Sequence, residues 1–274
     1  MKLSFVTFVC PDWELEKVVE QAANFGYAGV EFRCDAGHAH GVEIAMSQQD
    51  RIDVRYLLQQ HDVQAVCLAT SIQLITPQAI SQAKARIELA SDIGCKAVRV
   101  FCGVPPESQA PWQTIKALTK RLKELAQIAQ DHGIQVWLKM HDAMAHGADA
   151  AQVLQEVVGG KNQHSNGFGD AVKDLNVGIS YDCLHSYRMG EDLVKGFDAV
   201  KPYLKHACLH DGLEMPDRVE IKPMGEGDLP IRKLFELFKG FEGYVCGEWF
   251  YNQYGSSVEG SLARFASDIR DFRV

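Results

Sequence analysis

Eight short apolar runs, separated by stretches with helical periodicity, constrain the fold of this chain more than any other feature. Their residues are mostly apolar and alternate little, as in parallel strands that are covered on both faces. Eight such strands between helices predict right-handed crossovers and a single (β/α)8 barrel, a TIM barrel, over residues 1–274. The runs lie near residues 3–9, 28–32, 63–69, 97–101, 134–139, 176–181, 204–209 and 243–248.

Helix limits are marked by proline at the start and glycine at the end. One helical stretch begins with Pro77 and ends on Gly94, and another begins with Pro111 and ends on Gly133. Proline fits the first turn of a helix, and glycine adopts the left-handed conformation that ends one. These pairs predict whole helices between the strands.

Composition excludes several classes of protein. The net charge of −8 argues against a nucleic-acid partner, because phosphate binding needs a basic surface. No apolar run is long enough for a membrane span, and an acidic helix follows the short apolar N-terminus, which argues against a signal peptide. The eight cysteines form no CxxC pair, as expected of buried thiols in a reducing cytoplasm. We therefore expect a cytoplasmic protein, and a homo-oligomer remains open.

Five chemically reactive side chains each lie at or next to the end of one of the apolar runs. Glu31 is the last residue but one of YAGVEF, whereas Lys139 ends IQVWLK, Asp182 ends VGISYD, His210 ends KHACLH and Glu248 ends YVCGE. In a closed βα barrel, the C-terminal strand ends meet at one rim, where groups serve chemistry and not stability. The sequence therefore predicts that these side chains converge.

Three of these residues have the composition of a metal site. Asp182, His210 and Glu248 offer hard oxygen and imidazole donors, which suit Mn, Mg, Co or Zn. The support is positional, because spacing along the chain cannot reveal a site built from separate strands. For each residue, the alternative is an ordinary salt bridge or a hydrogen-bonded strand-end histidine.

Two further residues are candidates for binding substrate. His185 follows three positions after Asp182 and either contacts substrate hydroxyls or caps the start of a helix. Glu31 either binds substrate or pairs structurally with Lys139 or Arg99.

The segments after the last strands are expected to shape a pocket. The long loop 210–228 follows a strand and therefore lies at the reactive rim, where long loops often form lids. Trp249 and Phe250 follow the last strand and either wall a sugar pocket or simply pack.

The motifs EFR, YDCLHS, HACLHDG, GEGDLP and CGEWF together resemble the xylose isomerase-like barrel superfamily. This group includes sugar isomerases and epimerases, inosose and dehydroshikimate dehydratases, and the endonuclease IV branch. The resemblance implies a divalent metal on a Glu, an Asp, a His and a Glu from strands five to eight. The last three fall on Asp182, His210 and Glu248, and the histidine that contacts substrate falls on His185.

The sequence departs from this pattern at strand five. LKMH stands where the family has Leu-Glu-x-His, so Lys139 replaces the glutamate while His141, expected to contact substrate, is retained. In related epimerases the strand-five and strand-eight glutamates are both metal ligands and the acid/base pair. Three readings stay open: an ammonium that replaces the metal's charge, a neutral lysine acting as base or nucleophile, or a disabled site.

These residues and the resemblance lead to one expected function and two alternatives. We expect a metal-dependent isomerase or epimerase of a small sugar or polyol, in which Glu248 moves a proton through an enediolate and Lys139 is a second catalytic group. Binding of the divalent metal is expected to be weak or absent because of Lys139. The alternatives are a dehydratase of a cyclic polyol ketone and a catalytically impaired sugar-binding relative.

Overall fold

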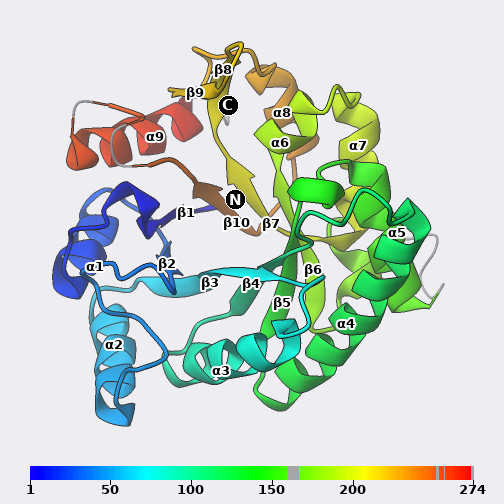
Figure 1. The fold of residues 1–274 in the computed structure, drawn as a ribbon. Coiled ribbons are helices and arrows are strands. Elements are labelled where there is room, and N and C mark those ends of the chain that lie inside the picture. The colour runs from blue at the N-terminus through cyan, green and yellow to red at the C-terminus, as the bar shows by residue number, and fades with distance from the viewer. Residues whose placement is uncertain (160–166, 251–252, 256, 273–274) are drawn as a thin grey trace.

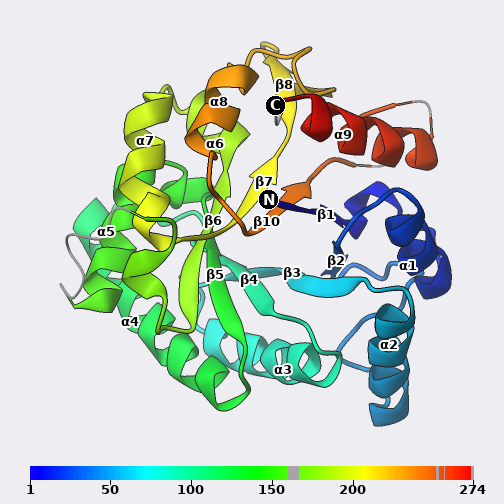
Figure 2. The same ribbon diagram turned by 180° about the vertical axis from the view of Figure 1, so that it is seen from behind.

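A computed structural model describes residues 1–159, 167–250, 253–255 and 257–272 of the chain. In this part of the chain, eight parallel strands close into a barrel that helices surround (Figures 1 and 2). This confirms the predicted TIM barrel. In order around the barrel, the strands are β1 (Lys2–Val6), β2 (Gly29–Arg33), β3 (Gln64–Gln73), β4 (Ala97–Phe101), β5 (Gln135–Lys139), β6 (Val177–Asp182), β7 (Leu204–Leu209) and β10 (Tyr244–Gly247).

The helices end where the sequence predicts. Gly94 follows α3 (Ala79–Asp92) with φ of 72°, and Gly133 follows α4 (Pro111–Asp131) with φ of 67°, a left-handed conformation that glycine adopts without steric cost. The α-helices are α1 (Leu15–Asn24), α2 (Gln48–Gln60), α3 (Ala79–Asp92), α4 (Pro111–Asp131), α5 (Gly147–Val158), α6 (Cys183–Arg188), α7 (Leu193–Val200), α8 (Ile231–Leu237) and α9 (Val258–Phe272). Among the described helices, none combines the length and apolar character that a membrane span requires.

The inside of the barrel is unusually polar. Glu31, Arg99, Lys139, Asp182 and His206 project from five different strands, and each is at most 1% exposed. A charge taken out of water is costly unless it is paired, so each of these groups needs a partner inside the barrel. The partners they find define the candidate site.

A small antiparallel hairpin interrupts the alternation of strands and helices. Strands β8 (Asp211–Glu214) and β9 (Val219–Lys222) follow β7 and stand at the rim, apart from the barrel sheet (Figure 1). The sequence predicts only a long loop over residues 210–228. The hairpin gives this loop a defined shape and brings Val219 and Ile221 to the wall of a pocket.

One buried carboxylate ties the segment that carries this hairpin. Asp211 accepts backbone N–H groups from Gly212, Gly225, Gly227 and Leu229 at 2.8–3.2 Å. A Cβ atom at Gly227 would lie 2.2 Å from Oδ1 of Asp211, so only glycine fits there. Asp211 thus holds both ends of the segment together.

Candidate functional site

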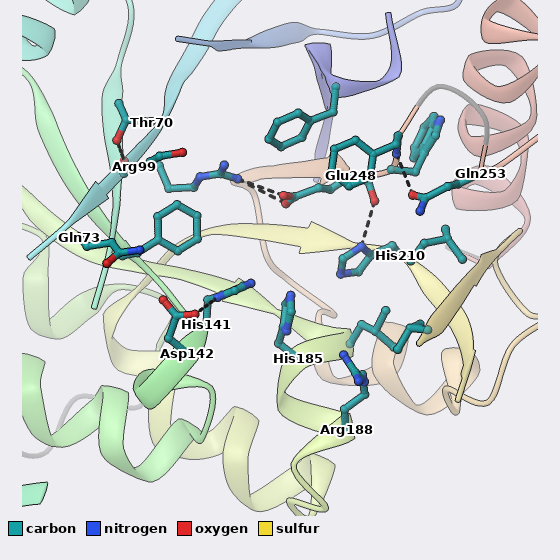
Figure 3. A pocket seen from close by; sticks show the side chains of 18 residues that line it. Thr70, Gln73, Arg99, His141, Asp142, His185, Arg188, His210, Glu248 and Gln253 are labelled. Atoms are coloured by element: carbon teal, nitrogen blue, oxygen red, sulfur yellow. Dashed lines mark hydrogen bonds and ion pairs between the residues drawn. The ribbon is translucent and has the colours of Figure 1, made fainter. Parts of the chain in front are cut away.

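A pocket of about 410 Å³ opens at the C-terminal ends of the barrel strands (Figure 3). That volume lies in the usual range for small-molecule sites. Trp249 and Phe250 line it, in agreement with one of the two readings of these aromatics. Its ionisable lining includes Arg99, His141, Asp142, His185, His210 and Glu248.

Lys139 lies beneath this pocket and binds two carboxylates. Its Nζ atom is 2.7 Å from Oδ2 of Asp182 and 2.6 Å from Oε2 of Glu248. Both Lys139 and Asp182 are at most 1% exposed, whereas the Glu248 side chain is 17% exposed and reaches the pocket. The structure therefore brings Lys139, Asp182 and Glu248 together, but Lys139 itself does not line the pocket.

Arg99 supplies a second cation to the same cluster. Its Nη1 atom lies 3.3 and 3.4 Å from the two carboxylate oxygens of Glu248 (Figure 3). Burial would raise the pKa of Glu248, but Lys139 and Arg99 outweigh burial and lower it. Glu248 is therefore an ionised carboxylate between two cations, and a poor proton acceptor.

The ionisation of Lys139 and Asp182 follows from their contact. Burial would lower the pKa of Lys139, but the Asp182 and Glu248 carboxylates outweigh it and raise the pKa well above its usual value. Burial likewise opposes ionisation of Asp182, whereas Lys139 and His210 hold its pKa well below the ordinary value. Lys139 is thus a protonated ammonium.

His210 donates from both ring nitrogens. Its Nδ1 lies 2.9 Å from the backbone oxygen of Glu248, and its Nε2 lies 2.9 Å from Oδ1 of Asp182. Both partners are acceptors, so the ring must carry two protons as an imidazolium. Burial would lower the pKa of His210, but Asp182 outweighs burial and raises it to about 9.

The expected ligands of a divalent ion are therefore assembled but already engaged. Oδ2 of Asp182 makes no hydrogen bond and forms an ion pair with Lys139. Both ring nitrogens of His210 carry protons, so neither has a lone pair for a metal. An ion bridging Asp182 and Glu248 would occupy the space of the Lys139 ammonium. With Lys139 in place, these residues do not fit a divalent metal.

A histidine–aspartate pair lies on the pocket wall. His141 Nδ1 donates to Oδ1 of Asp142 at 2.6 Å, and this hydrogen bond is the main cause of the lowered pKa of Asp142. The His141 ring lies against that of His185, with 4.0 Å between centroids. Figure 3 shows His141 directed toward His185. The pair leaves Nε2 of His141 as the nitrogen that can exchange a proton.

His185 faces the same pocket as a neutral ring. Burial lowers the pKa of His185 to about 4, although the Asp182 carboxylate opposes this. His185 does not cap the helix, which was its alternative role. Asp182 is the cap: its Oδ1 accepts the backbone N–H groups of Leu184 and His185 at the start of α6. The His185 side chain is thus left to face the pocket.

Glu31 does not lie with the other strand-end residues. It is fully buried and does not line the pocket. Its Oε1 accepts from Ser4 Oγ at 2.9 Å and from His206 Nε2 at 2.6 Å, and not from Lys139 or Arg99, the partners in the structural alternative. Since β2 continues to Arg33, Glu31 lies in mid-strand and points into the barrel. The geometry does not support a substrate contact.

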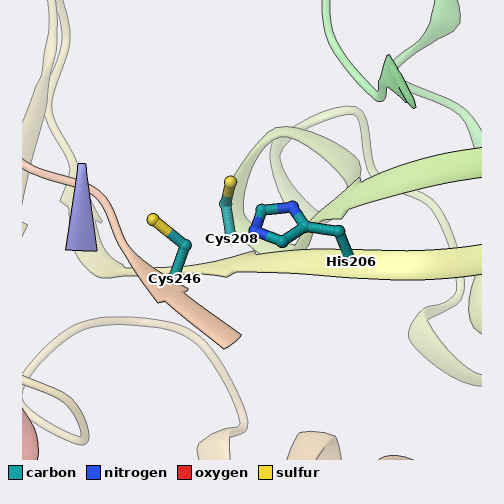
Figure 4. A group of neighbouring side chains, drawn as sticks. All are labelled: His206, Cys208 and Cys246. Carbon is teal, nitrogen blue, oxygen red and sulfur yellow. The ribbon is translucent and has the colours of Figure 1, made fainter. Parts of the chain in front are cut away.

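His206, the partner of Glu31, also belongs to a group of three possible metal donors. Ligand atoms of His206, Cys208 and Cys246 are within 4.8 Å of one another, inside the barrel (Figure 4). Both nitrogens of His206 are already bound, Nδ1 to Ser180 at 2.8 Å and Nε2 to Glu31. The imidazole therefore has no free nitrogen for a metal, and the group belongs to the polar interior.

Two pocket residues went unassigned on sequence reasoning. Arg99, considered only as a partner of Glu31, stands in the apolar strand AVRVF, where an isolated charge signals an interior partner. Asp142 directly follows His141, a juxtaposition that gains meaning only when the turn Asp142–Met144 folds the two side chains together.

Solved structures with the same fold are similar over nearly the whole chain. The IOLI protein with a bound zinc atom has a TM-score of 0.82 at 17% identity, covering 100% of this chain and 98% of its own. The probable 3-DHS dehydratase AsbF from Bacillus anthracis gives 0.76 and 17%, covering 98% and 99%. The 3-keto-D-glucoside 4-epimerase YcjR from E. coli gives 0.74 and 15%, covering 100% and 99%.

At these identities the likeness shows a common fold. No curated protein matches the sequence. The sequence pattern of one family does match, over residues 19–268 and therefore most of the chain. On that match, this chain belongs to the family of xylose isomerase-like TIM barrels.

Proposed function

We propose that this barrel moves a proton next to the carbonyl group of a small sugar or polyol ketone, as an isomerase or epimerase. The observation that carries the proposal is the His141–Asp142 pair facing the same pocket as the Arg99 guanidinium. The first is an oriented base and the second a fixed cation. Enolisation of a ketone needs both, because a proton leaves carbon as negative charge develops on oxygen.

His141 is the proposed general base. Its Nδ1–H bond to Asp142 fixes the ring and stabilises the imidazolium that forms when Nε2 takes a proton. Glu248, expected from the sequence to move this proton, is less suitable because Lys139 and Arg99 lower its pKa. The assignment of the base therefore changes from Glu248 to His141.

Arg99 is the proposed partner of the carbonyl oxygen. Its side chain is almost fully buried yet its guanidinium borders the pocket, so its field is little screened by water. His185, a neutral ring at pH 7, can donate to or accept from substrate hydroxyls. In the reaction, the C–H bond breaks toward Nε2 of His141, and the carbonyl electrons move onto the oxygen beside Arg99.

Return of the proton from His141 to the neighbouring carbon, with a hydroxyl proton passing between the two oxygens, completes an isomerisation. In an epimerisation, the same carbon takes a proton from solvent on its other face, and His141 releases its own proton to solvent. Loss of a β-hydroxyl as water from the same enolate would be a dehydration instead. None of these steps changes the oxidation state of the protein or needs an added oxidant.

Proton exchange with solvent tests the proposal directly. The wild-type chain would be incubated with a panel of ketoses and inososes in deuterated water and followed by proton NMR. We expect loss of one carbon-bound proton signal with the wild type and none with His141→Gln. Ultraviolet absorption of an enone would identify dehydration. If no candidate exchanges, but a polyol still raises the melting temperature, the sugar-binding alternative replaces this proposal.

A further inference from the structure

We propose that the ammonium of Lys139 takes the place of a divalent metal ion, so that the barrel works without one. The inference concerns the site of the proposed function and rests on that function for its chemistry. Its structural basis is the position of Nζ, within 2.7 Å of both Asp182 and Glu248. These are two of the residues that would hold a metal in the pattern that the family resemblance implies.

Charge balance supports the replacement. Asp182 and Glu248 are already faced by two cations, because Lys139 contacts both carboxylates and Arg99 contacts Glu248. A divalent ion placed here would add two positive charges where the carboxylates are already neutralised. In a buried region of low dielectric, that repulsion is only weakly screened.

The substitution itself conserves charge. The family resemblance implies a glutamate at position 139, and a glutamate with a divalent ion carries one net positive charge. The Lys139 ammonium carries the same charge in one side chain. A single change thus removes a ligand, fills the space of the ion and leaves the electrostatics of Asp182 and Glu248 balanced.

The orientation of His210 fits this account. Its Nδ1 donates to a backbone oxygen, the usual arrangement by which a protein aims the opposite nitrogen of a histidine at a metal. Here Nε2 meets Asp182 Oδ1 instead. The surroundings of a metal site are kept while the centre is occupied by the lysine.

Metal content measured apart from activity tests the inference. The wild-type chain would be stripped with a chelator, incubated with excess Zn²⁺ or Mn²⁺, gel-filtered and measured for metal by mass spectrometry. We expect well under one ion per chain. Lys139→Glu should bind at least about tenfold more tightly, because it adds a ligand and removes a repelling charge.

Two further variants complete the experiment. Lys84→Glu makes the same charge change on the exposed face of α3 and should gain no metal. Lys139→Gln removes the cation without adding a carboxylate, and added Zn²⁺ should raise its melting temperature but not that of the wild type. This variant decides the matter if Lys139→Glu does not fold.

The outcomes separate this inference from the proposed function. One tightly held ion per wild-type chain, or equal affinity in wild type and Lys139→Glu, would overturn the inference and leave proton transfer intact. A wild type that binds no metal and exchanges no substrate proton would retire the proposed function, and only the replacement of the metal ion by the Lys139 ammonium would stand.

Discussion

The ammonium of Lys139 lies 2.7 Å from Oδ2 of Asp182, at the C-terminal ends of adjacent strands β5 and β6. Each residue is at most 1% exposed, so neither charge can turn to water if the other is removed. The pair therefore belongs to the structure of the barrel as much as to its chemistry. Its loss has consequences that stability measurements can detect.

Removal of the lysine charge should destabilise the fold strongly. Lys139→Met removes the one cation that contacts both Asp182 and Glu248, and we expect a loss of about 3–5 kcal/mol in the free energy of unfolding. Urea denaturation followed by circular dichroism measures it. The triple variant Lys139→Met/Asp182→Asn/Glu248→Gln should recover most of this loss. Lys84→Met, on the surface, should change stability by less than about 0.5 kcal/mol. A loss in Lys139→Met as small as that of the control would contradict the buried pair.

The Glu31–His206 pair predicts a defined pH dependence. Burial would lower the pKa of His206, but Glu31 outweighs it and raises the value to about 9. The pair's stabilisation is therefore complete below the unfolded pKa of about 6.5, and is lost as pH rises through about 9. The carboxylate side acts oppositely: although burial opposes it, His206 lowers the pKa of Glu31, so stabilisation is lost as pH falls below the usual Glu range.

Glu31→Gln tests this dependence. The stability difference between wild type and variant, measured by urea denaturation, should be large near neutral pH and shrink toward about pH 9. Because His210 titrates in the same window in both proteins, its share cancels in the difference. Glu88→Gln, an exposed change on α3, serves as the control. A difference that stays constant from neutral to alkaline pH would show that His206 does not titrate as described.

Asp142 should act through His141. Asp142→Asn removes the carboxylate that orients and stabilises the imidazolium, so kcat for proton exchange should fall about 10²–10⁴-fold while KM changes little. Asp142 has φ of 51°, a conformation that asparagine tolerates, so the backbone should be preserved. Circular dichroism checks the fold, and the exposed Asp174→Asn is the control. If kcat is unchanged in Asp142→Asn, the general base is a residue other than His141.

Asp211 should control the hairpin without touching the chemistry. Asp211→Asn keeps the shape but weakens the four accepted N–H bonds, so the amides of Gly225, Gly227 and Leu229 should lose hydrogen-exchange protection before the barrel does. KM should rise several-fold, because the hairpin brings Val219 and Ile221 to the pocket. Asp217→Asn at the hairpin tip is the control. If these amides were equally protected from hydrogen exchange in Asp211→Asn and Asp217→Asn, Asp211 would not be the anchor of the hairpin segment.

Much of this architecture could be predicted from the sequence. Lys139 and Asp182 end strands β5 and β6, and His210 and Glu248 follow β7 and β10 directly, so the strand-end rule places them together. Glu31 fails the rule because its strand runs two residues further, to Arg33, which still pairs with Ala69 of β3. Apolar runs do not show where hydrogen bonding ends.

The ion pairs of the charged cluster could not be predicted from the sequence. That Lys139 binds both carboxylates, and that Arg99 joins from β4, depends on which strands face one another across the barrel. The hairpin β8–β9 was missed because its strands are only four residues each: DGLE does not alternate, and VEIK is too short for its alternation to distinguish a strand from a loop. These contacts depend on how the barrel closes in three dimensions, and the spacing of residues along the sequence does not reveal this.

Because His210 and Asp211 are adjacent but have different roles, the substrate range can evolve without a change in the reaction. His210 contacts Asp182 in the charged cluster with Lys139 and Glu248, and Asp211 ties the segment whose hairpin lines the pocket. Residues 213–224 between the anchor points can therefore change in length and side chain while the floor stays intact. New substrate specificities can arise by changes confined to this segment. Variants that differ only in this segment should still fold and should differ in the substrates they accept.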